Sequence, residues 1–290
     1  MQYSIVIPYY NAHKFIHDTL SSIFNQTVAP KEIIIVDDGS TETEAVQVLK
    51  ELAQIPRVIV LHQEKSGPAS ARNTGIENAT ADYILPLDSD DVIAPDYGRL
   101  ALEQFKLMPD SVVYGRAEFF GRKTGAWNLP PYSPGRLLFE NMIYVAAFYP
   151  RAAWEKVGGY DVQLTDGRED HEFWIRMILG LGLPVVQLEP VVFYYRQHDG
   201  GVNKAIGSNR KRLSSTYAEI FRRNAPIYAN HAELVVEEYL KMVDRINDYN
   251  NRYGRLERRL LGNGLLARVY QILRASRRLS KGRRKQRVNE

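Results

Sequence analysis

The stretch EIIIVDDGS, residues 32–40, joins a continuously apolar run to an acidic turn. The run Ile33–Val36 contains only β-branched residues, which is typical of a strand buried on both faces. Asp37 and Asp38 follow at its carboxyl end, and Gly39 permits a close approach of a ligand to the backbone. Ligands of parallel α/β sheets bind beyond the carboxyl ends of the strands. We therefore expect an α/β fold with a binding site at this edge.

Strand patterns alternate with helical patterns on both sides of this stretch. The expected strands are residues 3–8, 32–37, 58–61 and 83–87, and the expected helices are 13–24, 43–55 and 68–78. This alternation predicts a Rossmann-like, mostly parallel central sheet with helices on both faces. Polar or acidic turns follow three of these strands, at residues 8–11, 37–40 and 88–91.

The second half of the chain is less regular. We expect strands at residues 111–120, 143–149, 185–188 and 191–196, and a helix at 170–181. From about residue 208 the pattern is helical and polar. We therefore divide the chain into an α/β catalytic domain, residues 1–205, and a helical C-terminal extension, residues 206–290.

Charge is distributed unevenly along the chain. Residues 255–290 hold twelve Lys and Arg against two Glu, a net charge of +10, whereas the remaining residues carry a net charge of −6. The acidic body argues against a nucleic-acid-binding protein, which needs a basic face. Cysteine is absent, which fits a reducing cytoplasm, and no apolar run approaches the roughly 18 residues of a membrane span. We also find no signal peptide and expect a cytoplasmic protein.

Asp88, Asp90 and Asp91 lie within four residues, directly after a predicted buried strand. Their mutual repulsion would be relieved by a divalent cation, and carboxylate oxygens suit Mg²⁺ or Mn²⁺. The alternative is an acidic turn that caps the following helix. Two other candidate binding residues also have a purely structural interpretation. Asp38 could belong to a plain turn, and Arg72 could be a surface residue of an amphipathic helix.

Acidic residues also cluster at Glu169, Asp170 and Glu172, where a helix is expected to begin. They could simply interact with the helix dipole. In a functional interpretation, one carboxylate accepts the proton of an attacking hydroxyl group as a general base. His198 follows another expected strand and could be a metal ligand, a phosphate contact or a structural residue.

Taken together, these motifs resemble glycosyltransferase family 2, the inverting bacterial polysaccharide-type enzymes of the GT-A fold. The resemblance covers roughly residues 3–200. The strings that carry it are SIVIPYYN (4–11), IVDDGST (35–41), GPASARN (67–73), LDSDD (87–91), GGYD (158–161), ED (169–170) and YRQH (195–198).

The resemblance implies a role for each matching residue. Pro8, Tyr10, Asp38 and Arg72 would line the nucleotide pocket, and Asp88 would approach the ribose. Asp90 would bind Mn²⁺ or Mg²⁺, with His198 near the metal or the diphosphate. Asp170 would be the base, with Glu169 beside it near the acceptor.

The function implied is transfer of a sugar from a UDP- or dTDP-sugar to a hydroxyl of a glycan or lipid-linked acceptor, with inversion. A dehydrogenase is disfavoured because Pro8–Asn11 replaces the glycine-rich turn such enzymes need after the first strand. A nucleotidyltransferase is disfavoured by the GGYD and ED strings. A non-catalytic relative that binds sugar nucleotides is the alternative, although Asp90 and Asp170 are both present. The sequence leaves open whether the chain forms a homo-oligomer.

The tail shows an apolar stripe edged by basic residues. Leu265, Val269, Ile272 and Leu273 recur at near-helical spacing, with arginines among and after them. Such a stripe is typical of a helix that lies on an anionic membrane surface. The alternative is a stripe packed on protein, followed by a disordered end. The sequence thus predicts peripheral association with the inner face of the cell membrane.

Overall fold

A computed structural model describes residues 1–165, 167–198 and 210–261 of the chain. Two compact units are present, Met1–Ala232 and Glu233–Glu290. The predicted domain boundary after residue 205 falls outside the described residues and stays a prediction. The predicted tail helix, from residue 265 onward, also lies outside them.

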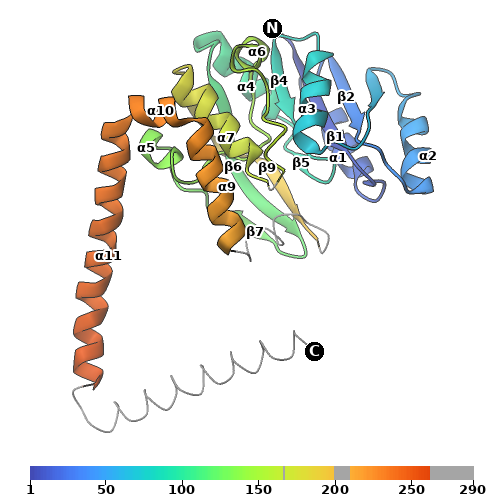
Figure 1. Cartoon of the computed structure of the whole chain (residues 1–290). Coiled ribbons are helices and arrows are strands. Elements are labelled where there is room, and N and C mark those ends of the chain that lie inside the picture. The colour runs from blue at the N-terminus through green and yellow to red at the C-terminus, as the bar shows by residue number, and fades with distance from the viewer. Residues whose placement is uncertain (166, 199–209, 262–290) are drawn as a thin grey trace. The chain divides into compact units, whose positions relative to one another are not determined.

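The first sheet contains five strands in the order β3-β2-β1-β4-β8 (Figure 1). They are β1 (Tyr3–Tyr9), β2 (Glu32–Asp37), β3 (Val58–His62), β4 (Tyr83–Pro86) and β8 (Tyr149–Pro150). The first four are parallel, and only β8 is antiparallel to its neighbour β4. Every residue of β2 is buried, as its continuous apolar run predicts. The predicted mostly parallel sheet is therefore confirmed.

Four helices come after the four parallel strands in the sequence, one after each. They are α1 (Ile16–Phe24), α2 (Thr43–Leu52), α3 (Pro68–Glu77) and α4 (Tyr97–Leu107). Helix α3 packs on β1 and β2 through Gly75, where an added Cβ would lie 2.4 Å from Cγ1 of Val6 and 3.1 Å from Cγ2 of Val36. Only glycine permits this close approach, which fixes where the helix holds its other side chains.

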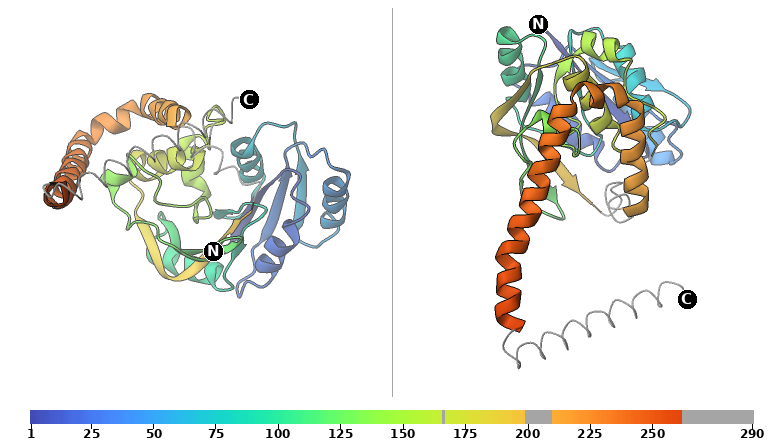
Figure 2. Two further views of the ribbon diagram at one scale, coloured as in Figure 1. Left: turned by 90° about the horizontal axis from the view of Figure 1, so that it is seen from below. Right: turned by 60° about the vertical axis from the view of Figure 1, so that its left-hand side comes forward.

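The second sheet has the order β5-β9-β6-β7 (Figure 1). Figure 2 shows β9, in yellow, beside β6, in green. Its strands are β5 (Val92–Ile93), β6 (Val112–Gly121), β7 (Gly125–Trp127) and β9 (Val185–Gln197). Strands β6 and β9 are parallel, with register shifts on either side of Arg116. The sequence predicted two separate strands at 185–188 and 191–196, but the chain forms one strand. These shifts absorb the interruption at Pro190, so the strand pairing continues past it.

The strand predicted at residues 143–149 is wrong for most of its length. Only Tyr149 belongs to a strand, and Phe148 forms an isolated bridge with Val113. Side chains satisfy backbone carbonyl groups in this buried segment instead of a neighbouring strand. Trp174 Nε1 donates to Ile143 O at 3.0 Å, and Tyr97 Oη donates to Ala146 O at 2.8 Å. An apolar run can thus be buried without strand pairing when its polar backbone groups find such donors.

The remaining helices lie between Pro134 and Leu261. They are α5 (Pro134–Leu137), α6 (Arg151–Val157), α7 (Glu169–Trp174), η1 (Ile175–Gly180), α9 (Arg210–Arg223), α10 (Ala225–Asn230) and α11 (Ala232–Leu261). The helix predicted at 170–181 is present as α7 and a π-helical segment, η1. Helices α9 to α11 agree with the predicted helical character beyond residue 208. Within the described part of the chain, no helix is both long and apolar enough to cross a bilayer.

Candidate active site

The strand topology brings the three predicted polar turns to one edge of the first sheet. Strand β1 pairs in parallel with both β2 and β4, so their carboxyl ends lie on the same side. The turns that follow them are residues 8–11, 37–40 and 88–91. The predicted nucleotide and metal residues are therefore on neighbouring strand ends.

Asp38 shapes the loop that leads into α3. Its Oδ1 accepts hydrogen bonds from Gln63 Nε2 at 2.8 Å and from the Ser66 backbone N–H at 2.7 Å. Its Oδ2 accepts one from the Gly67 backbone N–H at 2.8 Å. A carboxylate has about four acceptor positions, so three are already used by the protein. The buried Asp38 thus fixes the wall of the site, with little capacity left for a ligand.

Tyr10 and Pro8 lie at the end of β1. Pro8 is half-buried, and it pairs in register with Val36 of β2. The Tyr10 ring is 39% exposed, and Lys65 Nζ lies 3.7 Å from its centroid. Hydrogen bonding to Lys65 and Thr41 lowers the pKa of Tyr10. This edge therefore presents an aromatic ring beside a cation.

Arg72 joins two carboxylates that are far apart in the sequence. Its Nη2 donates to Asp88 Oδ1 at 2.7 Å, and its Nη1 donates to Glu169 Oε1 at 2.8 Å. The guanidinium group is almost fully buried, and the two carboxylates raise its pKa further above the usual range despite this burial. Among the residues that the structure describes, its Nε atom has no hydrogen-bond partner. Arg72 therefore bridges the end of β4 and the start of α7, a role that a surface helix residue could not have.

Asp170 lies in an environment that raises the pKa of its carboxyl group and fixes both of its oxygens. Its Oδ2 accepts a hydrogen bond from Asn141 Nδ2 at 2.7 Å, and its Oδ1 accepts one from the His171 backbone N–H at 2.8 Å. Burial and the neighbouring Glu169 carboxylate raise the pKa of Asp170 to about 6, although Arg72 counteracts them. An oriented carboxylate with a pKa near neutrality can accept a proton efficiently at physiological pH.

Asp90 and His198 are in direct contact, with Asp90 Oδ2 2.9 Å from His198 Nε2. Both side chains are about one quarter exposed, so a ligand can reach them. Burial and the nearby Asp88 raise the pKa of Asp90, an effect that His198 partly offsets. One carboxylate and one imidazole fit a Mn²⁺ or Mg²⁺ ion that takes its other ligands from substrate phosphates and water. Within residues 1–165, 167–198 and 210–261, no three His, Cys, Asp or Glu side chains form a metal cluster by themselves.

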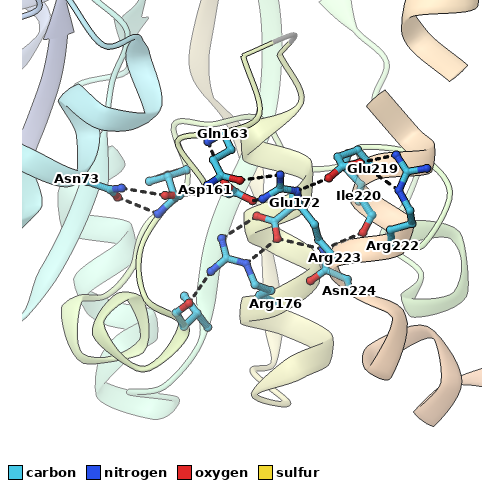
Figure 3. A network of polar contacts seen from close by, with 12 residues as sticks. Asn73, Asp161, Gln163, Glu172, Arg176, Glu219, Ile220, Arg222, Arg223 and Asn224 are labelled. Carbon is cyan, nitrogen blue, oxygen red and sulfur yellow. Dashed lines mark hydrogen bonds and ion pairs between the residues drawn. The ribbon is translucent and has the colours of Figure 1, made fainter. Parts of the chain in front are cut away.

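A network of polar contacts connects α7 with neighbouring segments of the chain (Figure 3). Buried Glu172 accepts two hydrogen bonds from Arg176, both at 2.7 Å, and one from Asn224 Nδ2 at 3.0 Å. Arg223 Nη1 in turn donates to Asp161 Oδ2 at 2.7 Å. These contacts tie the helix that carries Asp170 to the segment at the end of α9.

Five of the nine predicted site residues thus form two directly bonded groups, whereas Asp170 is bonded to Asn141 and to the His171 N–H. Asp88, Arg72 and Glu169 make one group, and Asp90 with His198 makes the other. Pro8, Tyr10 and Asp38 join neither group by a direct hydrogen bond or ion pair that the described residues show. Their common feature is their position at the same sheet edge.

Several supporting residues escaped the sequence analysis. Asn141 orients Asp170, and Asn73 accepts hydrogen bonds from Tyr160 N–H at 2.8 Å and Trp154 Nε1 at 3.1 Å. Asn73 lies within the GPASARN string, which gave a signal for the segment but not for this contact. Asn141 lies outside every motif, so no sequence signal pointed to it.

Comparison with known proteins agrees with this architecture. The sequence model of the family described as Glycosyl transferase family 2 matches residues 4–154, just over half of the chain. Chondroitin synthase of Escherichia coli is 31% identical over 180 residues, which cover 60% of this chain and 26% of the synthase. Glycosyltransferase GlyG of Streptococcus pneumoniae is 39% identical over 113 residues, 39% of this chain and 38% of GlyG. The chain therefore spans well under half the length of these curated relatives.

A solved structure supports the fold. S. aureus TarS 1-349 in complex with UDP-GlcNAc superposes with a TM-score of 0.66 at 19% identity, covering 82% of this chain and 71% of TarS. Such a likeness shows a shared GT-A fold, as the sequence predicted. Because the family model matches more than half of the sequence, the chain belongs to glycosyl transferase family 2.

Proposed function

We propose that the chain transfers a sugar from a nucleotide-diphosphate donor to a hydroxyl group of an acceptor, with inversion at the anomeric carbon. The observation that carries this proposal is the environment of Asp170. Its carboxylate is oriented by Asn141 and has a pKa of about 6, and its neighbour Glu169 is bonded through Arg72 to Asp88. The carboxylate proposed as the base therefore lies next in sequence to Glu169, which Arg72 connects to Asp88 after β4.

In the proposed reaction, the acceptor hydroxyl attacks the anomeric carbon from the face opposite the diphosphate. Asp170 accepts the hydroxyl proton while the new C–O bond forms and the bond to the diphosphate breaks. Glu169 is held by Arg72, so Asp170 is the carboxylate of this pair that remains available for the proton.

Asp90 and His198 would hold Mn²⁺ or Mg²⁺ in this proposal. When bound, the cation supplies positive charge that neutralises the diphosphate leaving group. Asp90 is suited to this position because burial and Asp88 already disfavour its ionised form, a cost that a cation removes. The present contact between Asp90 and His198 keeps both donor atoms at one place.

The donor is proposed to be a UDP-sugar or dTDP-sugar. TarS, which shares the fold, has been solved in complex with UDP and with UDP-GlcNAc. The acceptor is proposed to be a glycan or a lipid-linked saccharide of polysaccharide biosynthesis, since relatives include chondroitin and hyaluronan synthases. We further propose that the basic tail places the enzyme at the inner face of the cell membrane.

A screen of nucleotide sugars by thermal shift, with Mn²⁺ or Mg²⁺, tests the donor class. Positive donors are then assayed for release of the nucleoside diphosphate by the wild type and by Asp170→Asn. We expect release that requires both the cation and Asp170. Donor binding without any release, with and without candidate acceptors, would support a non-catalytic relative instead.

A further inference from the structure

The hydrogen bond between Asn141 and Asp170 is held from both sides by the segment of α9 and α10 (Figure 1). Asp170 lies in the first turn of α7, and Asn141 lies in the turn of residues 138–141 that follows α5. Asn224, between α9 and α10, is bonded to α7, and Tyr228 of α10 is bonded to the turn after α5. One segment therefore contacts the supports of both partners in this bond.

Asn224 fixes α7 close to Asp170 (Figure 3). Its Nδ2 atom donates to Glu172 Oε1 at 3.0 Å and to Ile220 O at 3.0 Å. The Asn224 amide is buried and both of its N–H groups are used, so its orientation is fixed. Glu172 is 2% exposed and lies two residues after Asp170 on the same helix. The Asn224 contact thus restrains the turn of α7 that carries Asp170.

Helix α10 also packs closely on η1, which continues α7. An added Cβ at Gly180 of η1 would lie 3.1 Å from Cδ1 of Ile227 on α10. This distance is shorter than an ordinary contact between two carbon atoms, so a larger residue at Gly180 would move α10 outward. The position of α10 is therefore set by apolar packing as well as by hydrogen bonds.

Tyr228 fixes the turn after α5. Its hydroxyl group donates to Leu138 O at 2.7 Å, three residues before Asn141. The turn is also held from α7, because His171 Nε2 lies 2.6 Å from Leu137 O. Burial lowers the pKa of His171 to about 4, so its neutral ring donates to this carbonyl group. The two buried carbonyl groups thus receive one donor from α7 and one from α10.

We propose that Tyr228 is a positioning residue for sugar transfer, whose hydroxyl group holds the turn from which Asn141 donates to Asp170. This inference rests on the proposed function, in which Asp170 is the general base. Asn224 acts from the other side by holding the helix of Asp170. The catalytic unit then includes α9 and α10, and it extends beyond the boundary expected after residue 205.

Tyr228→Phe tests the proposal, because it removes the hydroxyl group and keeps the ring. Leu138 O loses its donor, and the turn no longer holds Asn141 at its present distance from Asp170. A hydrogen bond donated to a carboxylate favours its ionised form, so weakening it raises the pKa of Asp170 above about 6. We expect the acid limb of kcat to move up by about 0.5–1 pH unit, and kcat near pH 7 to fall about two- to tenfold. The KM for the donor should be nearly unchanged.

Tyr3→Phe is the matched control. The Tyr3 hydroxyl group donates to Val28 O at 2.6 Å, so this variant also loses a bond from a buried tyrosine to a backbone carbonyl group. Tyr3 lies at the amino end of β1, away from the sheet edge that carries the site. Both variants should lower the Tm by similar amounts at about pH 4.5, but only Tyr228→Phe should change the pH profile. Equal profiles for the two variants would overturn the proposal.

Thermal unfolding gives a second readout that needs no turnover. A higher folded-state pKa of Asp170 costs stability at about pH 7.5, where the carboxyl group is ionised, and not at about pH 4.5. Tyr228→Phe should therefore lower the Tm more at the higher pH, and Tyr3→Phe should lower it equally at both. The extra loss should disappear when Tyr228→Phe is combined with Asp170→Asn. Equal loss at both pH values in Tyr228→Phe would contradict the inference.

The surroundings of Asp170 are otherwise the same in both variants. In the described part of the chain, the charged and titratable groups that interact with it are Glu169, Arg72, Arg168, His171, Tyr160 and Tyr217. Failure of the inference also differs from failure of the proposed function. Full turnover by Asp170→Asn would refute Asp170 as the base. Loss of turnover in that variant, with the same pH profile for Tyr228→Phe and Tyr3→Phe, would refute only the positioning role.

Discussion

Replacing Asp170 with Asn should slow sugar transfer and stabilise the folded protein at the same time. The wild-type carboxyl has a pKa of about 6 in place of 3.8, because burial and Glu169 oppose its ionisation. Since the folded-state pKa is the higher one, ionisation costs stability. This cost is absent below about pH 4, grows between pH 4 and 6, and is complete above pH 6.

The size of the effect follows from the shift in pKa. About two pH units correspond to at most about 3 kcal/mol of unfolding free energy at pH 7.5. The Asn side chain keeps one acceptor oxygen and loses the other, so one of the hydrogen bonds from Asn141 and the His171 N–H is lost, at about 1 kcal/mol. A net gain of about 2 kcal/mol should raise the Tm by about 4–8 °C for a unit of this size.

Thermal unfolding at pH 7.5 and pH 4.5 measures this gain, with turnover measured in parallel. We expect Asp170→Asn to be more stable only at the higher pH, and its kcat to fall about 10² or more with donor affinity nearly unchanged. Asp110→Asn, at an exposed Asp after α4, is the control and should change neither quantity. The reasoning fails if the two pH values give the same difference in Tm, or if turnover survives.

Three further changes test other parts of the site and chain. Asp90→Ala should abolish metal-dependent donor binding and transfer without unfolding the protein; full activity of this variant in the presence of a chelator would contradict the metal proposal. Arg72→Ala should lower stability by about 3–5 kcal/mol, because it leaves Asp88 and Glu169 without their shared cation. It should also weaken binding of the nucleoside diphosphate by about 1–3 kcal/mol in calorimetry, and unchanged values would refute the bridging role. A chain that ends at Asn263 should keep donor binding but lose salt-sensitive sedimentation with anionic vesicles. Equal sedimentation of the full chain and the shortened chain would contradict membrane binding by the tail.

Local signals in the sequence were sufficient for the four parallel strands of the first sheet, but not for the antiparallel strand β8. The run Ile33–Val36 could only be a buried strand, and four such strands separated by helices imply a parallel sheet. The second sheet was not foreseen, because β6 and β9 are separated by many residues and their pairing leaves no local pattern. Pro190 also suggested a break that the register shifts near Arg116 absorb.

The motifs identified which residues belong to the site but not how they are connected. Arg72 was expected to face a ligand, and the sequence contained no sign that it would bridge Asp88 and Glu169. Ion pairs between residues 97 positions apart depend on the tertiary fold, which propensity and spacing do not encode. The same holds for Asn141, whose amide finds Asp170 across 29 positions.

The dependence of the second sheet on β9 has a consequence for how the chain folds during synthesis. Both β5 and β6 pair with β9, which is not complete until Gln197 has been made. The Asp90–His198 contact spans 108 residues, so it too is among the last to form. Contacts with long sequence separation form slowly because the loops they close lose much chain entropy. A nascent chain that has already formed the parallel sheet therefore exposes the unpaired edges of β5 and β6 on the ribosome, and this interval is when aggregation or chaperone binding is most favoured.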